Sequence, residues 1–518
     1  MTDQAALRAE APRYLRPARR TQEATPLPEA AAMPAATAPL LLALFLAALL
    51  LPLNFSLGSL SLTPSRVLLL VAFVPLVFRW LTGAAGRVTT GDVLIALHCL
   101  WVGLALIALH GPDRIPYAGI TIIEIFGSYL MGRLLVRNAT DYRMHFRNVL
   151  IALVLLAPFV LVEMLTTRLV LSEILRSVAP THMKLQTDAD QMRMGLYRAQ
   201  AVLEHPILWG VFCSLTIANA FYIWRERFFR SVILTGFATG MTFTSLSSGP
   251  LLAAAIQLGI IGWGWITRNA WWVLISLVVL GYVVIDLISN RSPVQVLITY
   301  LTFNSGSAYW RLHIWTYGSA EVLNHPLFGI GLNDWDRPSW MGTASVDNFW
   351  LLTAMRYGLP AFLLLVAGIV ANIVQIVRQD LPERLADFRR GHVIATIGLA
   401  MTLCTVHAWG SGIVFVMFYF GSGAWLFTAT GATAAPAPVR AAQPRRGYRR
   451  ESEAAEDPEA VVAPPADQRS PRGGAIRGRT PGPPAHPVFQ PPSPRPPERA
   501  QARSDRLRQP RTEDARRG

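Results

Sequence analysis

Long apolar stretches recur between residues 39 and 429, and they constrain the fold more than any other feature. A helix that crosses the hydrocarbon core of a bilayer needs about 20 predominantly apolar residues. Charged residues make up 15% of the chain, whereas a soluble domain has about 25%. The sequence therefore predicts an all-α polytopic membrane protein with about 12 transmembrane helices. We place these helices at residues 39–57, 65–81, 92–110, 118–135, 148–166, 206–224, 231–247, 250–266, 270–288, 349–377, 392–409 and 411–429.

Arginines are concentrated in alternate connections between these stretches. They lie in both tails and in the segments RWLTGAAGR, RLLVRNATDYRMHFR, WRERFFR, TRN and RQDLPERLADFRR. Because basic residues that flank a span stay on the cytoplasmic side, both termini are predicted to be cytoplasmic. Two long connections, at about residues 167–205 and 289–348, are then extracytoplasmic, and we expect short surface helices in them.

The two ends of the chain differ in composition from its apolar middle. Residues 1–38 are rich in Arg, Ala, Pro and Glu, and residues 431–518 are rich in Pro, Arg, Ala, Gly and Glu. Such segments have too few apolar residues to fold, so both are predicted to be disordered. The basic C-terminal tail could contact anionic lipid or an assembly partner, but a solvated tail is the simpler interpretation. Residues 39–430 form the predicted transmembrane domain.

Composition and motifs exclude several classes of function. The net charge of +15 comes from tails and short loops, and the chain shows no basic, aromatic-interleaved pattern, so we expect no nucleic-acid partner. Cys99, Cys213 and Cys404 stand singly in apolar segments, which argues against disulfide or zinc sites. No phosphate-binding loop, dinucleotide fingerprint or HExxH helix is present. Any chemistry must therefore use an already activated substrate, or the chain carries out none. We expect no cofactor and no metal ion.

One short phrase occurs twice, as VLEHPILWG and as VLNHPLFGIG, once in each long outer connection. Arg198 precedes His205 by seven residues, and Arg311 precedes His325 by fourteen. These spacings are close to whole helical turns, so each arginine would share a helix face with its histidine. A helix should stop at each His-Pro junction. The pattern predicts two outer-surface helices that present guanidinium groups to one anionic ligand.

The residue types fit a diphosphate, although simpler interpretations exist. A guanidinium group binds phosphate oxygens bidentately and stays protonated. Alternatively, Arg198 and Arg311 extend to the membrane interface or pair with acidic residues there. For His205 and His325, capping or packing at a helix end is favoured over catalysis. Outer-loop aromatics could stack on sugar rings, but these residues also gather at membrane interfaces for other reasons; they are Tyr309, Trp310, Trp315, Trp335 and Trp340.

Acidic residues offer weaker candidates. Two Asp-x-Asp pairs resemble those of nucleotide-sugar enzymes, but they lie on the wrong side for cytoplasmic nucleotide sugars; they are Asp188 with Asp190 and Asp334 with Asp336. The main acidic residues within spans are Glu124, Glu163 and Asp286, of which the last two lie near outer ends. An ion-coupled transporter usually has ionisable groups near the bilayer midplane, so this distribution weakens a transporter interpretation.

The segment SVDNFWLLTAMRYGLPAFLLL and the loop before it resemble the O-antigen ligase and O-antigen polymerase superfamily of bacterial membrane glycosyltransferases. In that superfamily an arginine is followed by a Pro-Leu-x-Gly-x-Gly turn, then by His-[Asn/Ser] and, nine residues later, by Gly-x-x-Gly. Arg311, the HPLFGIG turn with Gly329 and Gly331, Asn348 and Gly358 match this pattern. TFTSLSSGPLLAAA and RAQAVLEHPILWG are similar to two earlier superfamily motifs, and the resemblance covers about residues 39–430.

Two positions depart from the superfamily pattern. Asp347 stands where the histidine is usual, and Ala361 replaces the last glycine. The histidine is thought to be the base in the ligases, so the resemblance leaves the choice between ligase and polymerase open. Asp347 is our candidate for the base, because an aspartate is ordinarily ionised at neutral pH and carboxylates activate nucleophiles in inverting glycosidases. A structural salt bridge or a helix cap is the alternative role for Asp347.

The resemblance implies transfer of a glycan from an undecaprenyl-diphosphate carrier to an acceptor hydroxyl at the periplasmic face of the bacterial inner membrane. Arg198 and Arg311 would stabilise the diphosphate, and the expected substrate-binding residues are His205, His325, Asn348 and Trp310. We expect a polymerase of an exported surface polysaccharide, either an exopolysaccharide or O-antigen. The alternatives are a ligase that joins glycan to lipid A core and a non-enzymatic transporter of lipid-linked glycan or solute. Membrane lipid and export or chain-length machinery are the expected partners.

Overall fold

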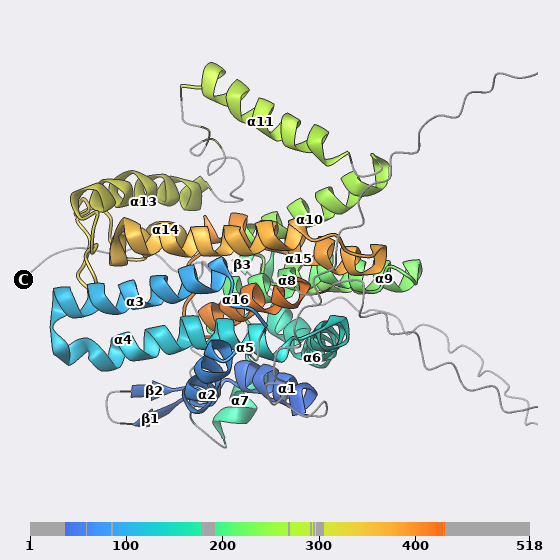
Figure 1. The fold of residues 1–518 in the computed structure, drawn as a ribbon. Coiled ribbons are helices and arrows are strands. Elements are labelled where there is room, and N and C mark those ends of the chain that lie inside the picture. Colours follow the sequence, from blue (N-terminus) through green and yellow to red (C-terminus); the bar gives the residue numbers. More distant parts are fainter. Residues whose placement is uncertain are drawn as a thin grey trace, which may run out of the picture. The chain divides into compact units, whose positions relative to one another are not determined.

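The computed structural model describes most of residues 37–427 and residue 429. The gaps are residues 58–59, 84–85, 167, 178–179, 181–191, 268–269, 291–292, 294–295 and 297–304. The two tails predicted to be disordered lie outside the described residues, except for residues 37–38 at the start of the first helix. Asp188 and Asp190 also lie outside the described residues. The described part is mostly helical, with two short antiparallel hairpins, β1–β2 and β3–β4 (Figure 1).

The elements follow one another in this order: α1 (Thr37–Leu50), β1 (Phe55–Leu57), β2 (Leu60–Leu62), α2 (Pro64–Leu81), α3 (Thr90–His110), η1 (Pro112–Arg114), α4 (Ile115–Ile122), η2 (Ile123–Gly127), α5 (Ser128–Leu135), α6 (Ala139–Thr166), α7 (Val170–Arg176), β3 (Met192–Arg193), β4 (Leu196–Tyr197), α8 (Pro206–Ile223), α9 (Phe228–Phe243), α10 (Ser248–Ile266), α11 (Trp271–Ile288), α13 (Ser305–Asn324), α14 (Phe349–Arg378), α15 (Glu383–Leu403), α16 (Ser411–Ser422) and η4 (Ala424–Phe427).

Every apolar stretch predicted to span the membrane contains a helix. Within the described residues, eight helical segments are long and apolar enough to cross a bilayer. They are α2, α3, the run from η1 to α5, α6, α8, α10, α11 and α14. The helices α1, α9 and α16 are apolar but shorter. A helical protein with several membrane-spanning segments is thus confirmed, while the count of about 12 stays a prediction.

Helix α8 is the most enclosed of the candidate spans and packs against α9, α10 and α15. Its residues Gly210, Ser214 and Ala218 are spaced by four and therefore share one face. Gln257 of α10 reaches this face, where its side-chain amide donates to the carbonyl of Ser214 and its oxygen accepts from the backbone N–H of Ala218. Small residues on α8 thus allow the two helices to approach closely.

The turn that follows α13 docks onto a break in α14. The break is at Gly358, whose φ of 82° and ψ of 169° interrupt the helix. There the backbone N–H groups of Ile330 and Gly331 donate to the carbonyls of Met355 and Arg356. The N–H of Leu359 donates to the carbonyl of Pro326. Because a broken helix leaves backbone groups without helical partners, this turn completes their hydrogen bonds and fixes the second outer loop on α14.

Candidate functional site

Three arginines meet at the serine-rich turn between α9 and α10, which comprises residues 244–248. Arg193 Nη1 donates to the carbonyl of Leu246 at 3.0 Å. Arg198 donates through Nε to the carbonyl of Ser245 at 3.3 Å and through Nη2 to Ser247 Oγ at 2.8 Å. Arg311 Nη1 donates to Ser248 Oγ at 3.3 Å. Two connections that are distant in sequence, both predicted to be extracytoplasmic and called the outer loops here, therefore bring their guanidinium groups to one turn.

Local packing holds the turn in place. Trp209 Nε1 donates to Thr244 Oγ1 at 3.0 Å, and the N–H of Ala199 donates to the carbonyl of Thr244 at 3.0 Å. A Cβ atom on Gly210 would lie 2.4 Å from Ser245 Oγ, so only glycine lets α8 come this close. The glycine that ends the motif RAQAVLEHPILWG is thus a packing residue that allows α8 to support the turn.

The three guanidinium groups line a cavity of about 490 Å³, which we call the arginine cavity. It combines residues from both long outer connections with the start of α10 and the segment that follows α15. Among its lining residues are Arg193, Arg198, His205, Ser247, Ser248, Trp310, Arg311, Ser345, Asp347 and Trp409. The structure therefore brings together Arg198, His205, Trp310, Arg311 and Asp347 from the residues that the sequence singled out.

Among the described residues that line it, the arginine cavity has more cations than carboxylates. Burial and the charges of Arg193 and Arg311 lower the pKa of Arg198 to about 9, while the charge of Asp347 opposes this shift. Arg198 therefore stays protonated at neutral pH. Burial also lowers the pKa of Arg311, again against the effect of Asp347. Since the cations disfavour one another, an anion with more than one negative charge would be stabilised among them.

Asp347 faces this cavity just before α14 begins. Its Oδ1 accepts a hydrogen bond from Ser345 Oγ at 3.1 Å, and its side chain is partly buried. The helix cap is formed by the next residue, because Asn348 Oδ1 accepts from the N–H of Leu351 at 3.0 Å. The helix-cap role considered for Asp347 is thus filled by its neighbour, Asn348. Asn348 is buried as a cap, and the described cavity lining includes Asp347 rather than Asn348.

His205 both caps α8 and lines the arginine cavity. Its Nδ1 accepts from the N–H of Ile207 at 3.1 Å, so the ring proton sits on Nε2. Burial, together with the charges of Arg198 and Arg193, lowers the pKa of His205 to about 3. The ring is therefore neutral at physiological pH and offers an Nε2–H donor. It lies edge-to-face against Trp409, with 5.6 Å between the ring centroids.

The two His-Pro motifs, VLEHPILWG and VLNHPLFGIG, are not structurally equivalent. The helix predicted between Arg198 and His205 is wrong, because residues 201–205 form turns and bends and α8 starts only at Pro206. The cause is a tertiary contact: the carboxylate of Glu163 on α6 accepts from the N–H groups of Gln200 and Ala201 at 2.8 and 3.0 Å. These bonds replace the helical hydrogen bonds of the segment.

The helix predicted before the second His-Pro motif is present, but His325 does not line the arginine cavity. Helix α13 ends at Asn324, next to His325. The His325 side chain is about half exposed and lies 3.5 Å from Glu321. It is not part of the described lining of the arginine cavity. Both arginines of the duplicated motifs and His205 therefore line the arginine cavity, whereas His325 does not belong to its described lining.

Other candidates from the second outer loop hold that loop together. Asp334 pairs with Arg337 at 2.5 Å, which lowers the pKa of Asp334. Trp335 is buried, and its Nε1 donates to the carbonyl of Ala344 at 3.1 Å. In the part of the chain that the structure describes, no group of three or more His, Cys, Asp and Glu residues is placed to hold a metal ion.

Sequence reasoning missed two residues of the site. Arg193 and Trp409 both line the arginine cavity, and neither belongs to a motif that the sequence singled out. A signal for Arg193 was its position, since it is one of the few cations in the first outer connection and lies five residues before Arg198. Trp409 lies in the short segment between α15 and α16. The spans predicted at residues 392–409 and 411–429 assigned almost all of this segment to helices, so Trp409 was not considered as a loop residue.

These observations define a polytopic helical membrane protein with an arginine-lined site formed by loops at one end of its spans. Residues 232–366 match the family model for O-antigen ligase. The match includes the serine-rich turn, Arg311, Asp347 and the break at Gly358. This region is therefore similar to the O-antigen ligase family, whose members act on lipid-linked glycans. No curated protein matches the chain.

Proposed function

We propose that this protein is a glycosyltransferase of the bacterial inner membrane that takes a glycan from an undecaprenyl-diphosphate carrier at the periplasmic face. It passes the glycan to a hydroxyl of a second glycan and so polymerises an exported surface polysaccharide. The observation that carries the proposal is the meeting of Arg193, Arg198, Arg311 and Asp347 around one cavity. Cations suit a diphosphate, and a carboxylate beside them suits a base.

The proposed reaction exchanges one bond at the anomeric carbon of the donor sugar. The bond from this carbon to the diphosphate oxygen breaks, and a bond to the acceptor oxygen forms. Asp347 accepts the proton of the acceptor hydroxyl. Arg198 and Arg311 stabilise the negative charge that develops on the departing undecaprenyl diphosphate. The arginines supply the positive charge that a metal ion would otherwise provide, so we expect transfer without a metal.

The serine-rich turn keeps the cations in place before substrate arrives. Ser247 and Ser248 accept hydrogen bonds from Arg198 and Arg311 through neutral hydroxyl oxygens. A neutral partner fixes the direction of a guanidinium group without cancelling its charge, whereas a carboxylate would do both. Charges that are already oriented need little reorganisation during the reaction. The turn thus supports a site prepared for an anionic leaving group.

Binding of undecaprenyl diphosphate by the purified full chain tests the role of the arginines. We expect Arg311→Lys to weaken binding about tenfold, because lysine keeps the charge but lacks the planar fork. Arg147→Lys is the matched control, since Arg147 is exposed on α6 at the predicted cytoplasmic end. Equal affinity of the wild type and Arg311→Lys for undecaprenyl diphosphate would contradict the proposal.

Deletion of the gene in the producing cell distinguishes polymerase, ligase and transporter. For a polymerase, we expect polymer to disappear while single repeat units accumulate on the carrier. Carrier-linked polymer that forms normally but never reaches the lipid A core would indicate a ligase instead. Carrier-linked glycan retained on the cytoplasmic leaflet would indicate a transporter without chemistry. The composition of carrier-linked glycan, measured by mass spectrometry, separates these outcomes.

A further inference from the structure

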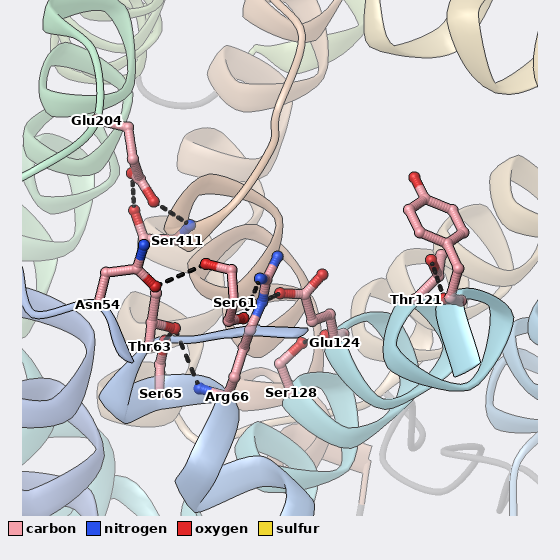
Figure 2. A network of polar contacts seen from close by, with 11 residues as sticks. Asn54, Ser61, Thr63, Ser65, Arg66, Thr121, Glu124, Ser128, Glu204 and Ser411 are labelled. Carbon is pink, nitrogen blue, oxygen red and sulfur yellow. Dashed lines mark hydrogen bonds and ion pairs between the residues drawn. The ribbon is translucent and has the colours of Figure 1, made fainter. Parts of the chain in front are cut away.

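A second cavity of about 670 Å³ lies beside the arginine cavity, and we call it the Glu124 cavity. Its walls come from α2, from the run η1 to η2, from the first part of α14 and from the segment between α15 and α16. Figure 2 shows the polar network along one side of it, where Arg66 and Glu124 point toward each other. None of the residues to which we assign a role in transfer lines this cavity.

Trp409 lines both cavities and so forms part of the wall between them. Its ring lies between two histidines, with centroid distances of 5.6 Å to His205 and 5.8 Å to His407. His205 lines the arginine cavity, whereas His407 lines the Glu124 cavity. Neighbouring residues also line different cavities where α14 begins. Asp347 lines the arginine cavity, and Phe349 lines the Glu124 cavity. At Trp409 a single side chain therefore borders both cavities.

The two cavities differ in charge. The arginine cavity has three guanidinium groups and one carboxylate among its lining residues. Among the described residues, the Glu124 cavity has equal numbers of both, and they are Arg66, Arg114 and Arg356 with Asp113, Glu124 and Glu204. Arg66 Nε donates to Glu124 Oε1 at 2.5 Å, so two of these charges neutralise each other directly. A cavity with balanced charge has no net attraction for a phosphate group.

The polar groups of the Glu124 cavity are held in fixed positions. Glu204 accepts from the N–H of Ser411 at 2.9 Å and also from its hydroxyl. Glu124 lies in the π-helical turn η2, a local irregularity that is frequent at functional sites. Several aromatic rings, among them those of Tyr117 and Trp409, belong to the same lining. Oriented carboxylates that accept hydroxyl hydrogen bonds, beside aromatic faces, suit a ligand with many hydroxyl groups.

We propose that the Glu124 cavity binds an uncharged saccharide, namely the accepting end of the second glycan. This inference rests on the proposed function and identifies the place of its acceptor. The accepting hydroxyl extends past Trp409 toward Asp347, while the lipid diphosphate stays with the arginines. A charged acceptor, such as a phosphorylated lipid core, is disfavoured because the cavity has no excess cation.

Site-specific photo-crosslinking in membranes of the producing cell tests this assignment with the natural pool of carrier-linked glycan as the probe. A benzophenone side chain replaces Thr121, which lines the Glu124 cavity, or Ser345, which lines the arginine cavity. The matched control replaces Leu104, an exposed residue of the membrane-spanning helix α3. Irradiated full-length protein is digested and analysed by mass spectrometry before and after mild acid, which releases the lipid diphosphate.

We expect a neutral saccharide adduct at Thr121 that remains after mild acid, and none at Leu104. Adducts of acyl chains alone at Thr121, or a yield no higher than at Leu104, would overturn the inference. Ser345 reports on the proposed function separately. An adduct of carrier-linked glycan at Ser345 without one at Thr121 leaves the proposed function standing and removes only the acceptor site. Without any glycan adduct at Ser345, the proposed function itself fails.

A cavity-filling variant gives an independent measurement. Thr121→Trp adds bulk inside the Glu124 cavity, and Leu104→Trp adds bulk on the exposed face of α3 as the matched control. We expect Thr121→Trp to lower polymer yield about tenfold while affinity for undecaprenyl diphosphate changes by less than about twofold. An unchanged polymer yield would contradict the inference. An equal loss of undecaprenyl diphosphate binding would do so as well, because it would show that the two cavities bind one ligand.

Discussion

Individual side chains explain why two remote arginines can serve one site. Arg198 and Arg311 belong to different outer loops, yet both donate to hydroxyls of the serine-rich turn. A serine accepts a hydrogen bond in many directions and adds no charge. The turn can therefore collect several guanidinium groups within a small space without neutralising them. Burial is the largest cause of the lowered pKa of Arg198, and the charges of Arg193 and Arg311 lower it further.

The variant Asp347→Asn tests the general base. Asparagine keeps the size and one side-chain oxygen but accepts no proton at neutral pH, so we expect transfer to fall by about 10²- to 10⁴-fold. Affinity for undecaprenyl diphosphate should not weaken, since a negative charge beside the arginines is removed. Polymer yield and lipid diphosphate binding are measured in parallel.

Asp336→Asn is the control, because Asp336 is exposed in the same loop and lies outside the described cavity lining. Full activity of Asp347→Asn would exclude the aspartate as the base.

The sequence predicted which residues lie near one another better than it predicted the helix ends and turns in which they lie. Arg198, Arg311, His205, Trp310 and Asp347 do share a cavity. His325 and Asn348 do not line it, because one ends a surface helix and the other caps α14. A short polar motif predicts the charge and hydrogen-bonding capacity of a site, since these belong to the residue itself. The direction in which a side chain points depends on where the neighbouring helix begins or ends. A short motif predicts that boundary only to within a few residues.

Element boundaries depend on tertiary contacts that hydropathy does not contain. Apolar length alone located a helix in each predicted span. It did not reveal that Glu163 would draw residues 200 and 201 out of a helix through two backbone hydrogen bonds. It also gave α14 as one continuous span, whereas Gly358 divides it and lets the turn at residues 326–331 dock. The glycine was visible in the sequence, but the partner that makes the break favourable came from another part of the chain.

Substitution of Gly358 by alanine should destabilise this docking. The residue has φ 82° and ψ 169°, a region that is essentially restricted to glycine and costs another residue ~1–3 kcal/mol. A Cβ atom would also lie 2.0 Å from the carbonyl oxygen of Leu327. We expect a lower unfolding temperature in detergent, measured by fluorescence-detected size-exclusion chromatography after heating. Gly342→Ala is the control, because a Cβ there meets nothing within 4 Å. Equal unfolding temperatures for both variants would show that the break does not stabilise the loop.

At the scale of the whole molecule, the charge distribution predicts one orientation. The loop residues that line the arginine cavity come from connections that the arginine distribution predicts to lie outside the cytoplasm. At the opposite ends of the spans, arginines form ion pairs within the bundle, such as Arg225 with Asp387 at 2.8 Å and Arg133 with Asp92 at 3.4 Å. Hydropathy and loop charge are properties of long segments, so they remain informative where single motifs are ambiguous.

This orientation predicts which exposed positions a membrane-impermeant thiol reagent can reach in intact spheroplasts. We expect Ser345→Cys to be labelled before lysis and Asp380→Cys only afterwards, since both residues are exposed but lie in connections predicted on opposite sides. Cys404 is exposed and is first replaced by serine to remove background. Labelling of Asp380→Cys in intact spheroplasts would invert the topology. The arginine cavity would then face the cytoplasm, where a carrier exposed at the periplasmic face could not reach it, and the proposed transfer would lose its donor.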